Sequence, residues 1–531
     1  MQVSSPRADL SCLACRRLKR RCDRKTPCAL CSRVGRACTY PSPESTPRGP
    51  RSGSSDETNI QVTSQPICRS QPHPRPGLPA AFFLDSVASR GVVPTLRNSL
   101  EWEHVGTDVP GLTVSEAREI AKVHFETTHC WFGIISKVRL DRRLVDNGPI
   151  NGADTTAMLY AMQLLAEPES STHEVYQAVK AALAHCESYG QLSLEFLAAN
   201  ILIAVHELSQ AIFPAAYLTV AMCSRLCYSM GWHDKRKATQ LLPKPDTWIE
   251  VEERRRLWWA VLLLDRYTHL GLRFRPLATL PIPSDEIIPA GDESWDIGEM
   301  AVNPLLVMSM TAAAPVAPFA RTCQAAHLLG RACQHVNEHP SAEDADLHFQ
   351  EAWQISKAAQ ALSTIINDES SASESPDRFY AGRALCYSAL MLLYDVHSCV
   401  EVDEVEACGG NRGLRLDLQQ LAIDGSKELA YQVHSFAMEL EQAHTINRGC
   451  LSPLVMYCLY SASGTFAWYV RESGDEKRLR CLNDLRRVLG LLQEKWQTAG
   501  ELHSALRKEN IADLIVSSRV FEPPRGDGIH V

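Results

Sequence analysis

Six closely spaced cysteines near the start of the sequence constrain its fold more than any other feature. They follow the pattern C-x2-C-x6-C-x5-C-x2-C-x6-C, in which each C-x2-C pair is followed six residues later by a third cysteine. A segment of about 30 residues with few large apolar side chains cannot bury enough surface to fold alone. Structural zinc supplies on the order of 10 kcal/mol of folding free energy to such segments. The cysteines are Cys12, Cys15, Cys22, Cys28, Cys31 and Cys38.

The number of cysteines indicates two zinc ions. Each C-x2-C pair can place two thiolates on one tetrahedral ion, and the third cysteine completes a half-site. Three ligands leave each ion one short, so two sulfur atoms must bridge the two ions. The alternatives are a redox pair, disulfides or a single four-cysteine site. Two pairs plus two single cysteines fit a redox pair poorly. Because no export signal is read, a reducing intracellular compartment is expected, in which disulfides are rare. A single four-cysteine zinc site would leave two cysteines without a role.

Basic side chains are concentrated inside this motif. Residues 1–51 contain 12 Lys or Arg and 3 Asp or Glu. The other 480 residues contain 42 Lys or Arg and 59 Asp or Glu. A basic head on an acidic body indicates a module that binds a polyanion. The stretch Cys15–Arg21 contains no helix breaker, and we predict a short helix that reaches phosphates and base edges. A solvated face or a nuclear import signal is the alternative. The predicted contacts are Arg16, Arg17, Lys19, Arg20, Arg21 and Lys25.

The segment SCLACRRLKRRCDRKTPCALCSRVGRACTYP resembles the fungal Zn(II)2Cys6 binuclear cluster, the DNA-binding domain of a large transcription factor family. It matches in all six cysteines and their spacings, in Lys19, in Cys22-Asp23 and in Pro27. The resemblance implies one helix after each C-x2-C pair and recognition of CGG-like triplets in double-stranded DNA. Where the family often has a second basic residue, this sequence has Leu18.

The resemblance also implies a role for each side chain. Cys12 and Cys28 would bridge the two zinc ions. Cys15 and Cys22 would complete one ion, and Cys31 and Cys38 the other. Lys19 would read bases, whereas Arg16, Arg20, Arg21 and Lys25 would contact phosphates, which set register and affinity but carry no sequence information.

Composition changes after the cysteine motif. Proline, serine and glycine make up 19 of the 40 residues from Pro41 to Ala80, which predicts an extended and mostly disordered linker. No heptad pattern occurs before residue 110, so a coiled-coil dimer of the kind found in many relatives is not indicated. We predict a zinc domain at 10–40, a linker at 41–110, a helical domain at 111–300, a helical C-terminal regulatory region at 301–515 and a tail at 516–531.

The body of the sequence reads as all-α. Thr113 and Glu116 fit a capping box for a helix that runs into Phe125. Apolar residues recur every three or four positions, as a helix requires. This pattern covers Met158–Leu165, Val175–Cys186, Leu194–Leu208 and Ala215–Met230, and Gly231 is a predicted helix stop.

The same patterns predict three features of the C-terminal half. The segments Asn367–Asp377 and Cys408–Gly413 are predicted loops. Six residues near the end follow a 3–4 spacing, which favours a terminal helix packed on its own body, with a dimer contact as the alternative. They are Leu482, Leu485, Leu489, Leu492, Trp496 and Ala499.

The stretch Ala216–Pro289 resembles the fungal-specific transcription factor domain, the helical middle region of the same family. The resemblance is carried by Gly231-Trp232-His233, the run Glu252–Trp259, Leu264-Asp265-Arg266, Arg275-Pro276 and Leu280-Pro281. From the residues themselves, we predict core and helix-packing roles rather than a ligand site. Glu252 and Arg256 are predicted to pair on the polar side of their helix.

An acidic segment, Asp285–Glu299, contains six acids and several large apolar residues. Acidic residues mixed with large apolar residues are found in activation domains. The composition of this segment nevertheless favours an acidic surface loop of the helical domain.

No enzyme motif is complete. There is no Gly-Lys dipeptide for a P-loop and no G-x-S-x-G. His173-Glu174 and His206-Glu207 begin H-E-x-x-H, yet the second histidine is Gln177 or Gln210. The other cysteines are scattered, and Cys223 and Cys227 are predicted core thiols.

These observations predict a nuclear, zinc-dependent, sequence-specific regulator of RNA polymerase II genes that is not an enzyme. Its partners would be double-stranded DNA and the transcription machinery or co-regulators, and a homodimer is an open alternative. No export signal or membrane span is read, so a membrane role is not expected. The resemblance to the family further implies that this protein activates a metabolic or secondary-metabolite gene set. The alternative is a zinc-thiolate metal, redox or ligand sensor, or a repressor, whose body mainly binds proteins.

Overall fold

The computed structural model describes two compact units, residues 1–73 and 74–531, each in part. In the first unit the described residues are 12, 15, 22–33 and 37–40; in the second they are 101–508 with gaps at 108, 147–149, 151, 167–171, 273–274, 301–307, 309–315, 339–343, 399–411 and 447–449. The predicted linker therefore lies outside the described residues up to residue 100, as does the predicted tail. Most of the predicted loop Cys408–Gly413 also lies outside the described residues.

The second unit is built of helices and contains no strand among its described residues, apart from one isolated bridge between Glu101 and Gly152, as predicted from periodicity. Its first helices are η1 (Trp102–Val105), α4 (Val114–Glu126), η2 (Thr128–Cys130), α5 (Lys137–Asp146), α6 (Ala153–Ala166), α7 (Thr172–Ser188), α8 (Leu194–Ser209), α9 (Ala215–Ser229), α10 (Trp248–Tyr267) and α11 (Asp292–Ile297). The later helices are α12 (Pro318–Asn337), α13 (Ala345–Ala372), η3 (Pro376–Phe379), α14 (Tyr380–Ser398), α16 (Arg412–Ile446), η5 (Pro453–Val455), α17 (Met456–Ser473), α18 (Glu476–Leu492) and α19 (Gln497–Lys508).

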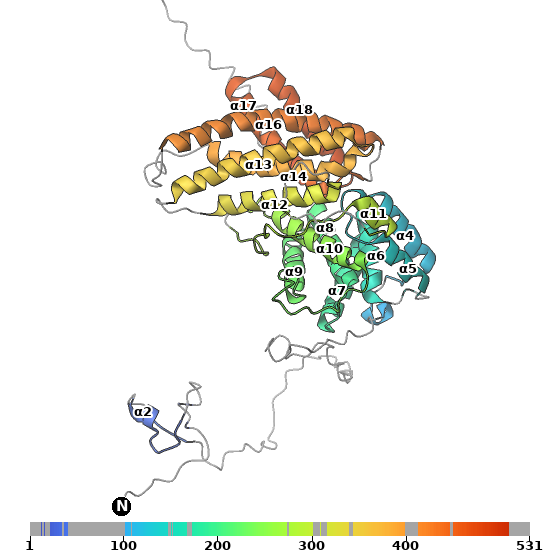
Figure 1. Cartoon of the computed structure of the whole chain (residues 1–531), viewed down its shortest axis with the longest axis vertical. Helices are drawn as coiled ribbons and strands as arrows, with labels where there is room; N and C mark the ends of the chain where they lie inside the picture. The colour runs from blue at the N-terminus through green and yellow to red at the C-terminus, as the bar shows by residue number, and fades with distance from the viewer. Residues whose placement is uncertain are drawn as a thin grey trace, which may run out of the picture. The chain divides into compact units, whose positions relative to one another are not determined.

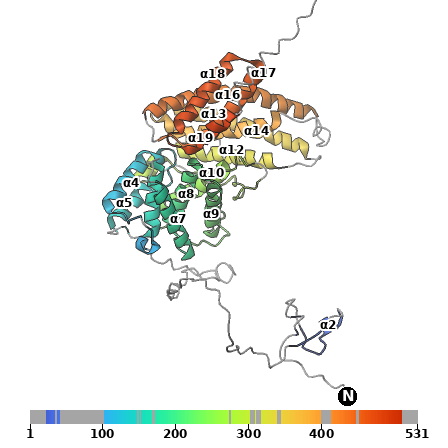
Figure 2. The same ribbon diagram turned by 180° about the vertical axis from the view of Figure 1, so that it is seen from behind.

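The helices form two adjoining groups within this unit. In Figure 1 the helices from α4 to α11 lie together, next to a bundle in which α13, α14 and α16 run side by side. Figure 2 shows the same grouping from behind. One apolar core lies mainly among α4–α12, and a second lies among α14 and α16–α19. Because α14 contributes residues to both cores, it joins the two groups.

Helix boundaries follow local signals. The predicted capping box is present, since the Thr113 hydroxyl accepts a hydrogen bond from the Glu116 amide at 3.3 Å and Glu116 accepts from the Thr113 amide at 2.8 Å. The helix stop at Gly231 is confirmed, with α9 ending at Ser229 and Gly231 in the left-handed region at φ +80°. Every residue of α8 is buried, as expected for a helix whose apolar residues are distributed over all of its faces.

A substitution at Gly231 tests the helix stop directly. A Cβ at this position would lie 2.5 Å from the Thr239 carbonyl oxygen, in addition to the left-handed strain. We expect Gly231→Ala to destabilise the chain by about 2–3 kcal/mol, measured from the urea unfolding midpoint. Gly474→Ala is the matched control, because Gly474 has φ +63° but no atom within 4 Å of the added Cβ. It should cost only about 1 kcal/mol. Equal losses would show that the Thr239 contact has no effect.

The prediction of a loop over Asn367–Asp377 is wrong for its first half. Helix α13 continues through Ala372, and only a short break precedes η3. Arg321 pairs with Glu369 at 2.5 Å, and the Arg383 guanidinium donates to the Asn367 side chain at 2.6 Å. The polar composition suggested a loop, but these contacts with α12 and α14 hold the last turns in the helix.

The six periodic residues near the C-terminus pack against the body of their own chain. All of them, Leu482 to Ala499, are buried in the second core. They do not lie on one helix, because α18 ends at Leu492 and α19 begins at Gln497, so that Trp496 lies in the connection and Ala499 on α19. The favoured interpretation of a helix packed on its own body is confirmed, with a break that the spacing did not predict.

The segment resembling the middle region has a structural role, as predicted. The Asp265 carboxylate accepts from the backbone amides of Ala278 and Thr279 at 3.0 and 2.9 Å, and Arg266 donates to the Leu280 carbonyl at 3.0 Å. These bonds hold the chain after α10 against that helix. Cys223 and Cys227 are buried core thiols, also as predicted.

The placement of Glu252 and Arg256 on a polar helix face is wrong. Both side chains are fully buried. The Arg256 guanidinium donates to Glu252 at 3.0 Å, to Asp292 at 2.8 Å and to the carbonyl of Gly133 at 2.9 Å. It also stacks on the Trp295 ring, 4.0 Å from its centroid. Tertiary partners satisfy these charges in the interior, which the i,i+4 spacing could not reveal.

The acidic segment is tied to the body through the same network. Residues Asp292–Ile297 form α11, and Trp295 and Ile288 are buried. The Trp259 indole donates to the Ile287 carbonyl at 2.9 Å. The segment therefore belongs to the helical domain, as favoured, although Ile288 and Trp295 lie in the interior while Ile297 stays exposed.

Candidate metal centre and nucleic-acid interface

The cysteine segment is organised by a few side chains around one short helix, α2 (Ala29–Arg33). The Asp23 carboxylate accepts from the Ala29 backbone amide at 3.2 Å, at the start of that helix. The Tyr40 hydroxyl donates to the Lys25 carbonyl at 2.7 Å and lies 3.6 Å from the Cys22 sulfur. These contacts bring the chain on both sides of α2 around the cysteines.

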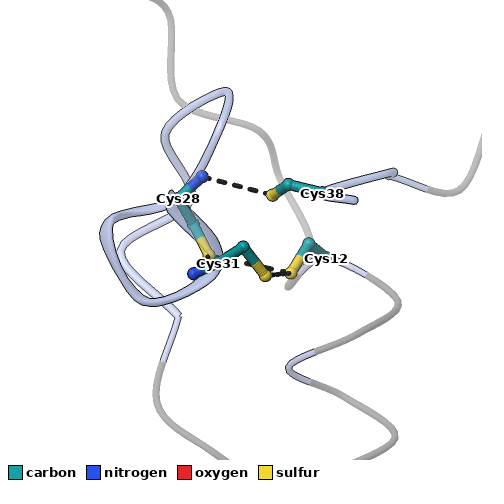
Figure 3. Close-up of side chains that lie close together, drawn as sticks. All are labelled: Cys12, Cys28, Cys31 and Cys38. Atoms are coloured by element: carbon teal, nitrogen blue, oxygen red, sulfur yellow. Dashed lines mark hydrogen bonds between the residues drawn. The ribbon is translucent and has the colours of Figure 1, made fainter. Parts of the chain in front are cut away.

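Four cysteines form the interior of this segment. Cys12, Cys15, Cys28 and Cys31 are buried, and Cys22, Leu30, Cys38 and Tyr40 pack against them. The Sγ–Sγ distances are 3.8 Å from Cys12 to Cys28, 3.7 Å from Cys12 to Cys31 and 3.6 Å from Cys15 to Cys28. Figure 3 shows the side chains of Cys12, Cys28, Cys31 and Cys38 turned toward one another.

The six sulfur atoms divide into two groups of four that share two members. One group contains Cys12, Cys15, Cys22 and Cys28, and the other contains Cys12, Cys28, Cys31 and Cys38. Within each group all sulfur atoms lie within 4.8 Å of one another. The shared pair, Cys12 and Cys28, is the pair assigned as bridging ligands from the family resemblance.

The donor set fits zinc. Four sulfur atoms at about 2.3 Å from a tetrahedral ion lie about 3.8 Å apart, which matches the observed separations. Backbone amides of Cys15, Cys28 and Cys31 donate to neighbouring cysteine sulfurs at 3.2–3.4 Å, as expected for sulfurs that carry negative charge.

The pKa values of the cysteine thiols agree with a site that requires bound cations. Hydrogen bonding with Cys28, together with burial, raises the pKa of Cys31 to about 12, and burial also raises the pKa of Cys15. A backbone hydrogen bond from Cys12 lowers the pKa of Cys22 to about 6. The protein alone therefore does not ionise all of these thiols together, and metal ions would supply the missing positive charge.

The predicted DNA contacts are only partly covered by the structure. Lys25 is exposed in the described residues, next to Arg24 at φ +60°. Arg16, Arg17, Lys19, Arg20 and Arg21, and with them most of the predicted helix Cys15–Arg21, lie outside the described residues. Their arrangement toward DNA stays a prediction.

Sequence reasoning missed the organising roles of Asp23 and Tyr40. Asp23 precedes its helix by six positions, so it is not recognised as a local N-cap. Tyr40 lies two residues after the last cysteine, and its position alone does not indicate that it reaches back to Lys25. Only the folding of the segment brings either side chain to its partner.

Known proteins match both parts of the chain. Residues 10–47 match the Fungal Zn(2)-Cys(6) binuclear cluster domain, and residues 121–296 match the Fungal specific transcription factor domain. Transcription factor BOA15 of Botryotinia fuckeliana (strain B05.10) is 36% identical over 147 residues, which cover 27% of this chain and 82% of that protein. The chain therefore belongs to the family of fungal Zn(2)-Cys(6) transcription factors.

Membership settles the cofactor and the general class. The binuclear cluster domain binds two zinc ions through cysteines, and the sulfur groups of this chain lie in the matched residues. The family consists of transcription factors and is not a class of enzymes. Among the helices that the structure describes, none is both long and apolar enough to cross a bilayer.

Proposed function

We propose that this protein is a nuclear, sequence-specific DNA-binding regulator of RNA polymerase II genes. The observation that carries the proposal is the pair of four-sulfur groups sharing Cys12 and Cys28, within a basic segment. Two zinc ions held there would fix the backbone that carries the basic side chains. Rigid presentation lets such side chains read base edges instead of only neutralising phosphates.

The proposed ligand roles follow the sulfur grouping. Cys12 and Cys28 bind both ions, Cys15 and Cys22 complete one, and Cys31 and Cys38 the other. Lys19 reads a CGG-like triplet, Arg16, Arg20, Arg21 and Lys25 contact phosphates, and Arg17 is a further DNA contact. The helical body governs output through contacts with co-regulators. Activation of a metabolic or secondary-metabolite gene set is the proposed outcome, supported by the resemblance to the family.

Binding of the full chain to duplexes with CGG triplets and to scrambled duplexes, across salt concentrations, tests this function. We expect Lys19→Ala to reduce the preference for CGG by about 5- to 150-fold, the range for one good base contact. Lys25→Ala is the matched control, because it should weaken binding to both duplexes alike and reduce the salt slope by about 1. Equal, salt-sensitive binding of the wild type to all duplexes would refute sequence-specific reading.

A further inference from the structure

A cluster of three histidines and one glutamate lies in the helical body, in a unit separate from the cysteine centre. His335 is in the last turn of α12, His348 and Glu351 are in the first turns of α13, and His397 is near the end of α14. His348 and Glu351 are three positions apart and therefore share one side of α13. We refer to these four residues as the histidine cluster.

The cluster is closely packed around His335. The His335 and His348 rings stack with centroids 3.8 Å apart and an angle of 15° between their planes. The Nε2 atoms of His335 and His397 are 3.0 Å apart. On the other side of the ring, Nδ1 of His335 lies 3.5 Å from Oε2 of Glu351. A ligand atom from each of His335, His348 and Glu351 lies within 4.8 Å of the other two.

The two nitrogens of His335 are in different situations. One proton must lie between the Nε2 atoms of His335 and His397, because two lone pairs would repel each other at 3.0 Å. When His335 donates this proton, its Nδ1 carries a lone pair that faces the Glu351 carboxylate. This Nδ1 atom is buried, and its nearest partner is Oε2 of Glu351 at 3.5 Å, longer than an ordinary hydrogen bond. In that arrangement a cation between the lone pair and the carboxylate oxygen stabilises both.

The surroundings would orient the ligands and admit an ion. The Arg331 guanidinium bonds Oε1 of Glu351 at 2.5 Å, which leaves Oε2 directed toward His335. His397 would hold the far nitrogen of His335, as partners of metal-bound histidines commonly do. His335 is 1% exposed, whereas the Glu351 side chain is 34% exposed, so the carboxylate side opens to solvent.

We propose that His335, His348 and Glu351 bind one divalent zinc ion, with His397 as the positioning residue. Binding requires the His348 ring to turn out of its stack on His335, because the in-plane lone pairs of two nearly parallel rings do not meet at one ion. Two imidazoles and one carboxylate form a known ligand class for zinc, with a fourth position open to water. Calcium and magnesium are not favoured, since they take oxygen ligands. The bound ion would fasten α12 to α13.

Zinc content of the tag-free full chain, dialysed against a weak chelator and reloaded, is the direct test. The wild type should hold one zinc ion per chain more than His348→Gln/Glu351→Gln. The matched control is His173→Gln/Glu174→Gln, which makes the same changes at two exposed positions of α7 and should keep the wild-type content. Zinc should raise the thermal midpoint of wild type and control by roughly 2–4 °C more than that of the cluster variant.

His397→Gln keeps all three proposed ligands and tests the positioning role. We expect it to weaken zinc binding to the cluster by about 10- to 100-fold, the usual effect of losing a partner of a metal-bound histidine. Circular dichroism of each variant checks that the helices remain folded. Equal zinc content and equal midpoint shifts in the wild type and the double cluster variant would overturn the proposal and leave a hydrogen-bonded histidine stack. None of these measurements depends on DNA binding.

Discussion

Replacing Cys28 with serine is expected to remove both zinc ions and to abolish selective DNA binding by the full chain. Cys28 is a member of both four-sulfur groups, so its loss affects both coordination shells. Among the described residues of this segment the buried interior consists of cysteines, without an apolar core that could replace the metal. Affinity for the target duplex should fall to the non-specific level, by at least about 10³-fold. Zinc content per chain and DNA titration at fixed salt measure the two effects.

Two controls separate the shared ligand from other cysteines. Cys38→Ser removes a sulfur that lies in only one group, so it should lose zinc less completely than Cys28→Ser. Cys223→Ala removes a buried thiol of α9 that lies in neither group, and it should keep both ions and normal DNA binding. Excess chelator should reproduce the Cys28→Ser result in the wild type. Cys28→Ser should hold two zinc ions fewer per chain than the wild type, and a loss of only one ion would contradict its role as a ligand of both.

Replacing Arg256 with methionine is expected to destabilise the helical body by about 3–5 kcal/mol. The substitution removes the cation that the buried carboxylates of Glu252 and Asp292 share. Glu252 then keeps Arg255, and Asp292 keeps only the distant Arg378 at 3.9 Å. Burial alone lowers the pKa of Arg256, but Asp292 and Glu252 raise it overall, so the guanidinium stays charged. The loss should appear as a lower urea midpoint for the transition that reports the helical unit.

The neighbouring Arg254 provides the control on the same helix. Arg254 pairs with Glu250 at a more exposed position, and Arg254→Met should cost less than about 1 kcal/mol. Arg256→Met combined with Glu252→Gln and Asp292→Asn should recover part of the stability, since the buried charges are then removed together. A loss of less than 1 kcal/mol for Arg256→Met alone would show that the network does not hold α11 on α10.

Local patterns predicted much of the fold. The capping box at Thr113, the stop at Gly231 and the helical runs between residues 157 and 232 all appear where the spacing placed them. Each of these signals depends on residues within a few positions of one another. The errors at Asn367–Asp377 and at Arg256 arose where partners far along the chain, such as Arg321 and Asp292, changed the environment of a polar residue.

The sequence by itself determined the class of protein, its zinc cofactor and its helical body. Ligand type, ligand spacing and helix periodicity are local properties, and they are read without knowledge of the fold. Only the tertiary structure decided that Asp23 and Tyr40 organise the cysteine segment and that Arg256 carries a buried ion network. It alone brought His335, His348, Glu351 and His397 together. Such clusters join residues from separate helices, and their positions depend on how the helices pack rather than on local spacing.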